Sequence, residues 1–397
     1  MEQQDHRRRP HHHKNSSPQP PRWWTKETVA IVTGANKGIG FSLVRKLACL
    51  GVTVILTCRN VERGTEAVKV LREEGIHVRF RRLDILDPSS IESFVAWFGH
   101  SLGALDILVS SSSSPLRYGN MLSKMRVNNA AVSFNEVNGN SVDRAETVIN
   151  TNYRGTKRLT QALLPFFRRS STVSRILNIS SRLGHVNKVK NPKFTALLRG
   201  ESLLESEVDA MVTSFLSDVK EGTWRVKGWP EVWTDYAVSK LALNSYSKIL
   251  AKRNAGFGLS VNCYCPGFTQ TSMTGGVGKR TADEAAATTA MLVLLPPEEL
   301  PTGVFFAGCD PVINSRERPG VNSTDRLRGR EKSINILCRV MAGSFAYRSL
   351  APKTKNLVVA GGLSAFVLGV YFYTMRAVGG TDELQSAIDK FEEQRNK

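Results

Sequence analysis

Short apolar runs alternate with amphipathic stretches through most of this chain. Apolar runs at residues 29–32, 53–57 and 105–109 have the length and composition of strands that are buried on both faces. The stretch after the first run, residues 39–50, has a helical period. Because strands that alternate with helices usually form a parallel sheet covered by helices, we expect a doubly wound α/β fold.

A longer helical pattern lies in the second half of the chain. Its apolar residues recur at i, i+3, i+4 and i+7, and they are Val208, Met211, Val212, Phe215, Leu216 and Val219. This pattern predicts an amphipathic helix within a helical insert at residues 185–233. Three tryptophans, Trp224, Trp229 and Trp233, follow the helix, and they either line an apolar pocket or anchor the insert.

The two ends of the chain lack this alternation. Residues 1–26 mix Arg and His runs with Pro, Gln and Ser, which predicts a disordered basic tail. Residues 316–340 are polar and basic, as in a linker. Residues 357–375 carry no charge and are long enough to cross a hydrocarbon core of about 30 Å. We therefore expect an α/β domain at 27–315 and, at 341–397, a single transmembrane helix followed by an amphipathic C-terminal helix.

The first strand enters the first helix through a glycine-rich turn, T-G-A-N-K-G-I-G at residues 33–40. Backbone N–H groups at such a helix N-terminus form a site for an anion, and dinucleotide pyrophosphates bind there. Gly34 would permit the tight turn, Gly38 the approach of the pyrophosphate and Gly40 the close packing of the helix. By itself the turn is also compatible with a purely structural role.

Tyr236 and Lys240 are four residues apart on a predicted helix, so they share one face. A lysine ammonium beside a phenol favours the phenolate, which suits a tyrosine that exchanges a proton near neutral pH. Ser181 follows an apolar strand at residues 175–177. In this order after the glycine turn, the three residues indicate a site for proton transfer.

These motifs resemble the short-chain dehydrogenase/reductase family over residues 27–315. The matching stretches are T-G-x-x-x-G-x-G at 33–40, N-N-A at 128–130, N-x-x-G at 152–155, S-x-x-G at 181–184, Y-x-x-x-K at 236–240 and P-G at 266–267. Within the family the chain looks most like the plant carbonyl reductases. The resemblance implies a Rossmann-like fold, a nicotinamide cofactor and a small-molecule carbonyl substrate.

The resemblance also implies a catalytic role for four residues. Tyr236 would be the general acid/base, and Lys240 would lower its pKa and hold the nicotinamide ribose. Ser181 would polarise the substrate carbonyl, and Asn152 would position a water in the proton relay. Ser180 is the alternative serine, but the S-x-x-G spacing favours Ser181.

Charge near the glycine turn favours NADP(H) as the cofactor. The strand at 53–57 is followed by Arg59 rather than by the acidic residue that selects NAD, and Lys37 lies within the turn. Alternatively, both cations are only solvated surface charges. The resemblance extends the expected cofactor-binding set to Gly34, Asn36, Lys37, Gly38, Ile39, Gly40, Arg59, Asp84, Ile85, Asn128, Tyr236, Lys240, Pro266, Gly267 and Thr271.

Composition limits which partners, metal sites and cell compartments fit the chain. The net charge of +19 would suit nucleic-acid binding, but the basic residues are scattered and no nucleic-acid motif occurs, so we expect no nucleic-acid partner. The six cysteines show neither zinc nor disulfide spacing, so we expect no metal site and a reducing compartment. The reductase domain is accordingly expected in the cytoplasm.

Two segments break the pattern of the family. The N-N-A stretch with Asn128 should follow the strand at 105–109 directly, yet residues 110–127 intervene, and either Val109 or Val127 would supply the last valine. We interpret this insert, which would interrupt the sheet beside the nicotinamide site, as a retained intron or a gene-model error. Residues 341–397 are similar to single-span mitochondrial factors for cytochrome oxidase assembly, which suggests two joined reading frames, in nature or on paper.

The sequence therefore predicts an NADPH-dependent carbonyl reductase for ketones or aldehydes. The insert at 185–233 resembles that of monomeric carbonyl reductases, where it covers a dimerisation surface, so we expect a monomer; a plain surface helix is the alternative. The rival function is a non-catalytic, membrane-anchored assembly or interaction protein whose reductase domain is damaged by residues 110–127. If the C-terminal segment is real, residues 357–375 would anchor the chain, with a mitochondrial membrane as one option.

Overall fold

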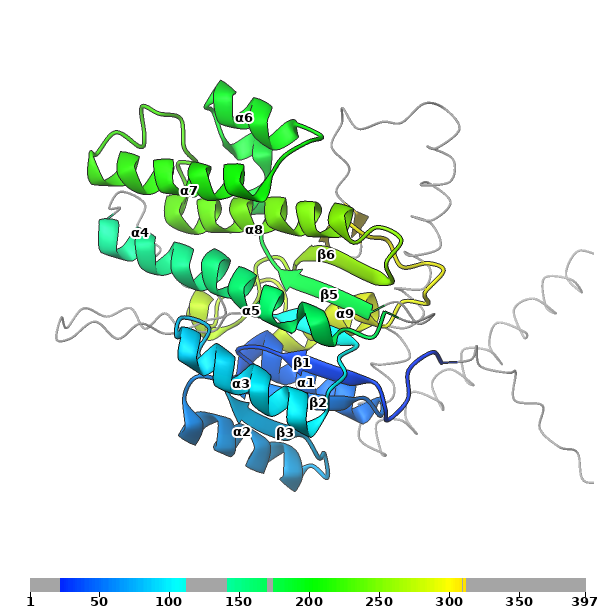
Figure 1. Ribbon diagram of the computed structural model, residues 1–397. Coiled ribbons are helices and arrows are strands. Elements are labelled where there is room, and N and C mark those ends of the chain that lie inside the picture. Colours follow the sequence, from blue (N-terminus) through cyan, green and yellow to red (C-terminus); the bar gives the residue numbers. More distant parts are fainter. Residues whose placement is uncertain (1–21, 112–140, 170–173, 309, 312–397) are drawn as a thin grey trace, which may run out of the picture. The chain divides into compact units, whose positions relative to one another are not determined.

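Eight strands form one sheet in a computed structural model of the protein, which describes residues 22–111, 141–169, 174–308 and 310–311 (Figure 1). The strands are β1 Val29–Val32, β2 Thr53–Cys58, β3 Arg79–Arg82, β4 Ile107–Ser110, β5 Ser174–Ile179, β6 Leu259–Cys265, β7 Phe305–Ala307 and β8 Asp310–Pro311. Their order is β3-β2-β1-β4-β5-β6-β7-β8, and only the β7–β8 pair is antiparallel. The order reverses between β1 and β4, and doubly wound sheets bind their ligands at the carboxyl ends of the strands there.

Helices cover both faces of this sheet. They are α1 Gly38–Cys49, α2 Val61–Glu73, α3 Pro88–Ser101, α4 Val142–Ile149, α5 Thr156–Leu163, α6 Pro192–Arg199, α7 Glu205–Lys220, α8 Thr234–Arg253 and α9 Ala282–Val293. Shorter turns are the π-helical η1 Asn150–Gly155 and the 3₁₀ turns η2 Leu164–Phe166, η3 Arg182–Gly184, η4 Val186–Lys188 and η5 Ser272–Thr274. In Figure 1 α3, α4, α5 and α8 lie in front of the sheet, while α1 and α9 pack together behind it. The predicted doubly wound α/β fold is confirmed.

The main core lies between the sheet and the front helices. Side chains alternate along each strand, so Val29 and Ile31 of β1 face Phe94 and Phe98 of α3 within one buried cluster. The same cluster continues through α5 and α8 into α7. All four residues of β1 are buried, as expected of a central strand with helices on both sides.

The predicted amphipathic helix is α7. Five of its six predicted apolar residues are buried, and Leu216 is partly buried against the same core. Trp229 anchors the insert, because its fully buried ring stacks on Phe194 at 4.6 Å and its Nε1 donates to Asp218 Oδ2 at 2.7 Å. Trp224 is partly buried against that core, whereas Trp233 lies elsewhere, beside Tyr236.

The end of the predicted tail is fixed to the sheet. Trp23 Nε1 donates to the carbonyl of Leu294 at 3.1 Å, and Trp24 Nε1 donates to that of Leu50 at 3.3 Å. The guanidinium of Arg175, which is almost fully buried in β5, lies 3.5 Å from the centre of the Trp23 ring. Trp23 and Trp24, within the segment that the sequence assigns to the tail, thus contact the α/β domain.

The sheet continues past the predicted start of the 110–127 insert. Val109 supplies the last valine of β4, since it pairs with Val32 on one side and Leu177 on the other. Ser110 pairs with β5. The backbone carbonyl of Ser111 accepts a hydrogen bond from the Thr33 hydroxyl, and the Ser111 N–H donates one to the same hydroxyl, both at 2.8 Å. The expected interruption of the sheet is thus absent at these two serines, while Asn128 and the rest of the insert lie outside the described residues.

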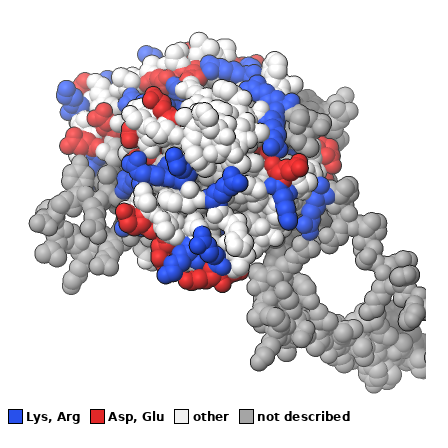
Figure 2. All heavy atoms as spheres, turned by 60° about the horizontal axis from the view of Figure 1, so that its bottom comes forward, with Lys and Arg blue, Asp and Glu red and all other residues white. Residues whose placement is uncertain are grey.

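Charge is mixed over the face shown in Figure 2. Lys and Arg side chains lie there in several separate groups, with Asp and Glu side chains beside most of them. Such a distribution differs from the continuous basic stripe that tracks a nucleic-acid backbone. No helix in the described part of the chain is long and apolar enough to cross a membrane, and residues 357–375 lie outside that part.

Candidate active site

The glycine turn joins β1 to α1 at the point where the strand order reverses. Gly34 and Gly38 have φ angles of 59° and 56°, a left-handed conformation that glycine adopts without steric cost. A Cβ on Gly40 would lie 2.9 Å from both the Cα of Ala35 and the carbonyl oxygen of Gly34. The three glycines therefore make the tight, close-packed turn that the sequence predicted, and Asn36 and Lys37 lie within it.

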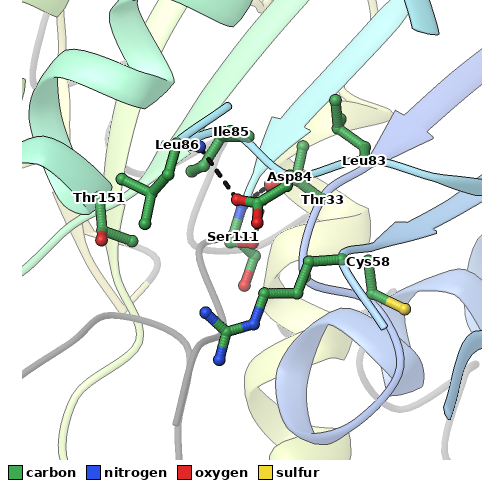
Figure 3. A pocket seen from close by; sticks show the side chains of 10 residues that line it. Thr33, Cys58, Leu83, Asp84, Ile85, Leu86, Ser111 and Thr151 are labelled. Carbon is green, nitrogen blue, oxygen red and sulfur yellow. Dashed lines mark hydrogen bonds between the residues drawn. The ribbon is translucent and has the colours of Figure 1, made fainter. Parts of the chain in front are cut away.

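A pocket opens beside this turn at the carboxyl ends of β1, β2 and β4 (Figure 3). It is lined by Thr33, Gly34, Cys58, Arg59, Leu83, Asp84, Ile85, Leu86, Ser111 and Thr151. The Asp84 carboxylate accepts from the Leu86 N–H at 3.0 Å, which holds the loop after β3 in place (Figure 3). Three predicted cofactor residues, Arg59, Asp84 and Ile85, thus lie together with Gly34.

Three cations gather at the edge of this pocket. The pKa of Lys37 is lowered by its partial burial and then by the positive charges of Arg63 and Arg59. Such mutual repulsion is relieved by an anionic ligand. Arg63 was not predicted from the sequence, although its spacing of four from Arg59 at the start of α2 is a signal that would have found it.

Tyr236 and Lys240 lie one turn apart in α8, as predicted. Lys240 Nζ is 5.6 Å from the centre of the Tyr236 ring and donates to the carbonyl of Ile179 at 2.9 Å. The Ser181 hydroxyl lies close enough to the Tyr236 phenol to lower its pKa, and both residues line one cleft. Ser180 instead donates to Asn244 Oδ1 at 2.5 Å, so the S-x-x-G spacing selected the serine that faces the tyrosine.

Gly184, the glycine of the S-x-x-G stretch, brings the serine loop onto α8. A Cβ at this position would lie 2.5 Å from the Lys240 carbonyl carbon and 2.6 Å from the Leu241 nitrogen. No side chain fits there without a shift of the loop or the helix. The close contact therefore fixes the distance between the loop that carries Ser181 and the helix that carries Tyr236 and Lys240.

Asn152 lies in the π-helical turn η1 between α4 and α5, and it is fully buried. Its Nδ2 donates to Ser239 Oγ at 3.0 Å, and that hydroxyl donates to the carbonyl of Tyr236 at 2.7 Å. A Cβ on Gly155 would lie 2.6 Å from the carbonyl oxygen of Ile85. The N-x-x-G stretch thus joins α8 to the loop that lines the nucleotide pocket.

Burial is the largest influence on the pKa values of Tyr236 and Lys240. It raises the pKa of the Tyr236 phenol well above its ordinary value, and the nearby Ser181 hydroxyl only partly opposes this. It also lowers the pKa of Lys240 to about 8. The net shift of the Tyr236 pKa is therefore upward, because desolvation of the phenolate costs more than Ser181 offsets.

A cleft of about 450 Å³ connects these groups. Its lining includes Ile39, Ser181, Tyr236, Lys240, Pro266, Gly267 and Thr271. The Thr271 hydroxyl is buried without a hydrogen-bond partner, as are those of Ser110 and Ser111 at the end of β4. Among the residues that the structure describes, no cluster of His, Cys, Asp and Glu has the form of a metal site.

Ile39 of the glycine turn lines the same cleft as Tyr236, and Gly34 of that turn lines the cationic pocket, so the turn connects the two. The class of protein that this arrangement defines is the nicotinamide-dependent oxidoreductases of the doubly wound fold. Sequence comparison places the chain within this class. The family model described as short chain dehydrogenase matches residues 28–196.

Individual relatives match a larger share of the chain than this family model does. (+)-Neomenthol dehydrogenase of Arabidopsis thaliana is 36% identical over 288 residues, which cover 70% of this chain and 95% of that protein. Salutaridine reductase of Papaver bracteatum is 37% identical over 298 residues, 71% of this chain and 94% of that protein. Carbonyl reductase [NADPH] 1 of Sus scrofa is 34% identical over 286 residues, 70% and 91% of the two chains. The chain belongs to the short-chain dehydrogenase family, and it is an oxidoreductase.

Solved structures agree with this assignment. Salutaridine reductase from Papaver somniferum superposes with a TM-score of 0.62 at 32% identity, over 71% of this chain and 100% of that one. Menthone neomenthol reductase from Mentha piperita gives a TM-score of 0.57 at 31% identity, over 70% and 98%. A second family model, described as Cytochrome c oxidase assembly factor 3, matches residues 347–379. It confirms the resemblance noted for the C-terminal segment, which lies outside the described residues.

Proposed function

We propose that the chain is an NADPH-dependent carbonyl reductase, which converts ketones or aldehydes to alcohols with Tyr236 as the proton donor. The observation that carries the proposal is the cleft in which Ser181, Tyr236 and Lys240 meet, next to the glycine turn. Relatives named for carbonyl reduction, among them Carbonyl reductase [NADPH] 1 of Sus scrofa and of Rattus norvegicus, support the same reaction and cofactor.

The residues present fit NADPH. The turn at Gly34, Gly38 and Gly40 would hold the pyrophosphate, and the cations Lys37, Arg59 and Arg63 would hold the 2′-phosphate. The unpartnered Thr271 hydroxyl, which lines the same cleft as Tyr236, would offer a hydrogen bond to the nicotinamide half. When bound, NADPH supplies the hydride that the carbonyl carbon accepts.

The chain's own residues would handle the proton. Because its pKa is raised, the Tyr236 phenol stays protonated at neutral pH and is ready to donate to the carbonyl oxygen as that oxygen gains charge. Ser181 would hydrogen-bond the same oxygen, and the Lys240 ammonium would stabilise the phenolate that remains. Asn152 would hold Tyr236 in place through Ser239. The water that Asn152 is expected to position stays a prediction.

The variant Tyr236→Phe tests this mechanism in the full-length protein. Because the ring stays and only the proton donor is lost, ketone reduction should fall by about 10²–10⁴-fold while the Kd for NADPH is unchanged. Tyr246→Phe is the matched control, since Tyr246 is also buried in α8 and its hydroxyl has no partner. Retention of most activity in Tyr236→Phe would show that another group supplies the proton.

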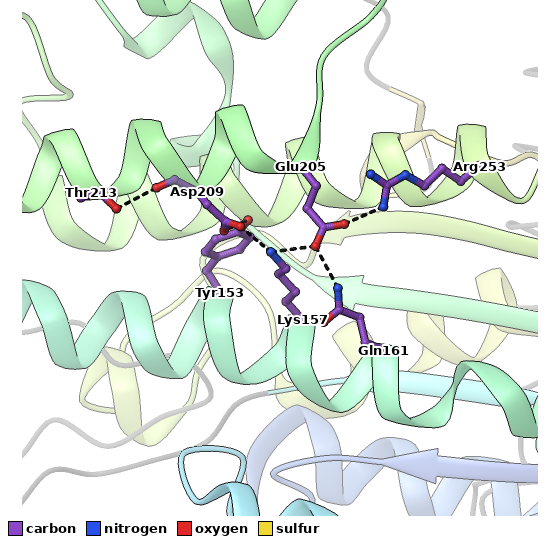
Figure 4. A network of polar contacts seen from close by, with 7 residues as sticks. All are labelled: Tyr153, Lys157, Gln161, Glu205, Asp209, Thr213 and Arg253. Atoms are coloured by element: carbon purple, nitrogen blue, oxygen red, sulfur yellow. Dashed lines mark hydrogen bonds and ion pairs between the residues drawn. The ribbon is translucent and has the colours of Figure 1, made fainter.

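We also propose that the reductase domain is a monomer, since α7 packs on α4 and α8 and is paired with Lys157 of α5. A polar network joins α5, α7 and α8 (Figure 4): Lys157 Nζ contacts Asp209 Oδ2 at 2.6 Å and Glu205 Oε1 at 2.7 Å. Tyr153 Oη donates to Asp209 at 2.8 Å, and Arg253 pairs with Glu205 at 2.7 Å. A surface occupied in this way is closed to a second subunit. Light scattering after size-exclusion chromatography tests the proposal, which a dimer of the full-length chain would refute.

A second role is favoured by the match of residues 347–379 to Cytochrome c oxidase assembly factor 3. In this proposal residues 357–375 span a membrane and tether the reductase domain to it. Alkaline carbonate extraction of membranes from cells that express the full chain tests the tether. Release of the chain into the supernatant would refute it, and long-read sequencing of the transcript would show whether residues 316–397 and 1–315 are encoded together.

A further inference from the structure

We propose that Trp233 selects the substrate, and that the preferred substrate is an uncharged ketone whose carbonyl carbon carries a flat apolar ring. The inference rests on the proposed carbonyl reduction and deepens it, because it names the class of carbonyl compound that the cleft accepts. Three observations support the inference: the backbone conformation at Trp233, the position of its ring and the apolar character of the cleft walls.

The backbone at Trp233 is strained. Its φ and ψ of 50° and 54° are left-handed, and it is the only residue other than glycine with a positive φ in the described part of the chain. Glycine or asparagine normally occupies such a position, whereas a bulky side chain there is an outlier. Strain of this kind persists where the surroundings hold it, and it clusters at ligand sites. Trp233 directly precedes α8 and is three residues before Tyr236, so the strain lies next to the proposed proton donor.

This conformation turns the indole toward Tyr236. The two rings meet edge to face, with centroids 6.1 Å apart and an interplanar angle of 79°. Trp233 is partly buried against a small cluster that contains Tyr236 and Met273, and all three line the cleft. It therefore forms a flat wall beside the phenol that would donate the proton. Trp229 differs, since its ring is fully buried in the insert and its N–H is bonded to Asp218.

The rest of the cleft wall is also apolar near its mouth. Val232 and Phe268 line it and are 54% and 49% exposed, so they present apolar surface at its mouth. Leu183 lines it as well. Its two charged lining residues are Lys240, which is bonded to the Ile179 carbonyl, and the exposed Arg182. A ring on the carbonyl carbon would lie against the indole and displace water from these walls, whereas a small aliphatic ketone would leave them wet.

The test compares acetophenone with acetone as substrates of the full-length protein and two variants at this position. Trp233→Asn removes the ring but tolerates the left-handed backbone, so it should unfold at the same or a higher temperature. We expect kcat/KM for acetophenone to fall about 10-fold in Trp233→Asn, mainly through KM, which corresponds to ~1.4 kcal/mol. Acetone reduction and the Kd for NADPH should be unchanged. Trp233→Phe, which keeps a ring and the strain, should retain most of the preference.

The outcomes separate this inference from the function on which it rests. If wild-type protein reduces neither ketone with NADPH, the proposed function itself fails. If it reduces both, and the acetophenone-to-acetone ratio is the same in Trp233→Asn, only the role of Trp233 is overturned. A preference for phenylglyoxylate over acetophenone that disappears in Arg182→Ala would refute the proposal that the substrate is uncharged. It would show that a substrate carboxylate binds at Arg182.

Discussion

Gly184 sets the spacing between the serine loop and α8, so the variant Gly184→Ala tests whether that spacing controls catalysis. The added methyl would lie 2.5 Å from the Lys240 carbonyl carbon, 2.6 Å from the Leu241 nitrogen and 2.8 Å from the Lys240 Cβ. Two of these atoms belong to the backbone of a buried helix, which cannot rotate out of the way. The loop must therefore retreat by about 1 Å to restore ordinary van der Waals contact.

Two effects of different size follow from this shift. Overpacking of a buried contact costs about 1–3 kcal/mol of stability, which would lower the melting temperature by several degrees. The hydroxyl of Ser181 would also move relative to the Tyr236 phenol, and a displacement of about 1 Å in an active site can cost about 10²-fold in rate. We therefore expect a large loss of kcat in a protein that is still folded at 25 °C.

Steady-state ketone reduction and thermal unfolding, measured on the same preparations, separate the two effects. Gly222→Ala is the control: its φ of 71° strains any side chain, but no atom lies within 4 Å of the added Cβ. That variant should lose about 1 kcal/mol of stability with normal kcat. The reasoning is refuted if Gly184→Ala keeps wild-type kcat, or if Gly222→Ala loses kcat to the same degree.

Three further predictions concern charge. Arg59→Asp should lower the preference for NADPH over NADH by at least about 10-fold, whereas Arg72→Asp on the exposed side of α2 should not; an unchanged ratio would remove the 2′-phosphate role of Arg59. Since the pKa of Lys240 is lowered to about 8, its ammonium is present below that pH and lost above it. The Kd for NADPH should therefore rise as the pH passes about 8, and a flat profile like that of Lys240→Met would contradict this. Asp209→Asn should cost about 1 kcal/mol in thermal unfolding because it breaks a partly buried pair, while Glu231→Gln at the exposed Lys190 pair should cost almost nothing; equal losses would count against the network.

Local signals in the sequence predicted much of the fold and the site. The turn at residues 33–40 needs glycine for conformational reasons that are visible in the chain itself, and the structure shows those φ angles and contacts. The period of α7 and the four-residue spacing of Tyr236 and Lys240 are equally local. Such features depend on neighbours within one turn or one strand, so they require no knowledge of the tertiary structure.

Features that depend on contacts between residues far apart in the chain could not be predicted from the sequence. Trp229 and Trp233 lie in one short segment and look alike in the chain, yet one anchors the insert and the other faces the cleft. The pKa of Tyr236 is raised mainly by burial, which depends on the tertiary structure and cannot be read from the Tyr236–Lys240 spacing. The pairing of Tyr153 with Asp209 joins residues that are far apart in sequence, and no pattern in either segment indicates it.

Because β4 is fully paired on both sides, residues can be inserted after it without breaking the sheet. Pairing with β1 ends at Val109 and pairing with β5 ends at Ser110, and the hydrogen bonds of Ser111 with Thr33 secure the strand immediately afterwards. Any residues added beyond that point leave every rung of the sheet in place and cost little loop entropy. A shifted splice junction there would escape selection against misfolding and would be exposed only to selection on the chemistry next to it.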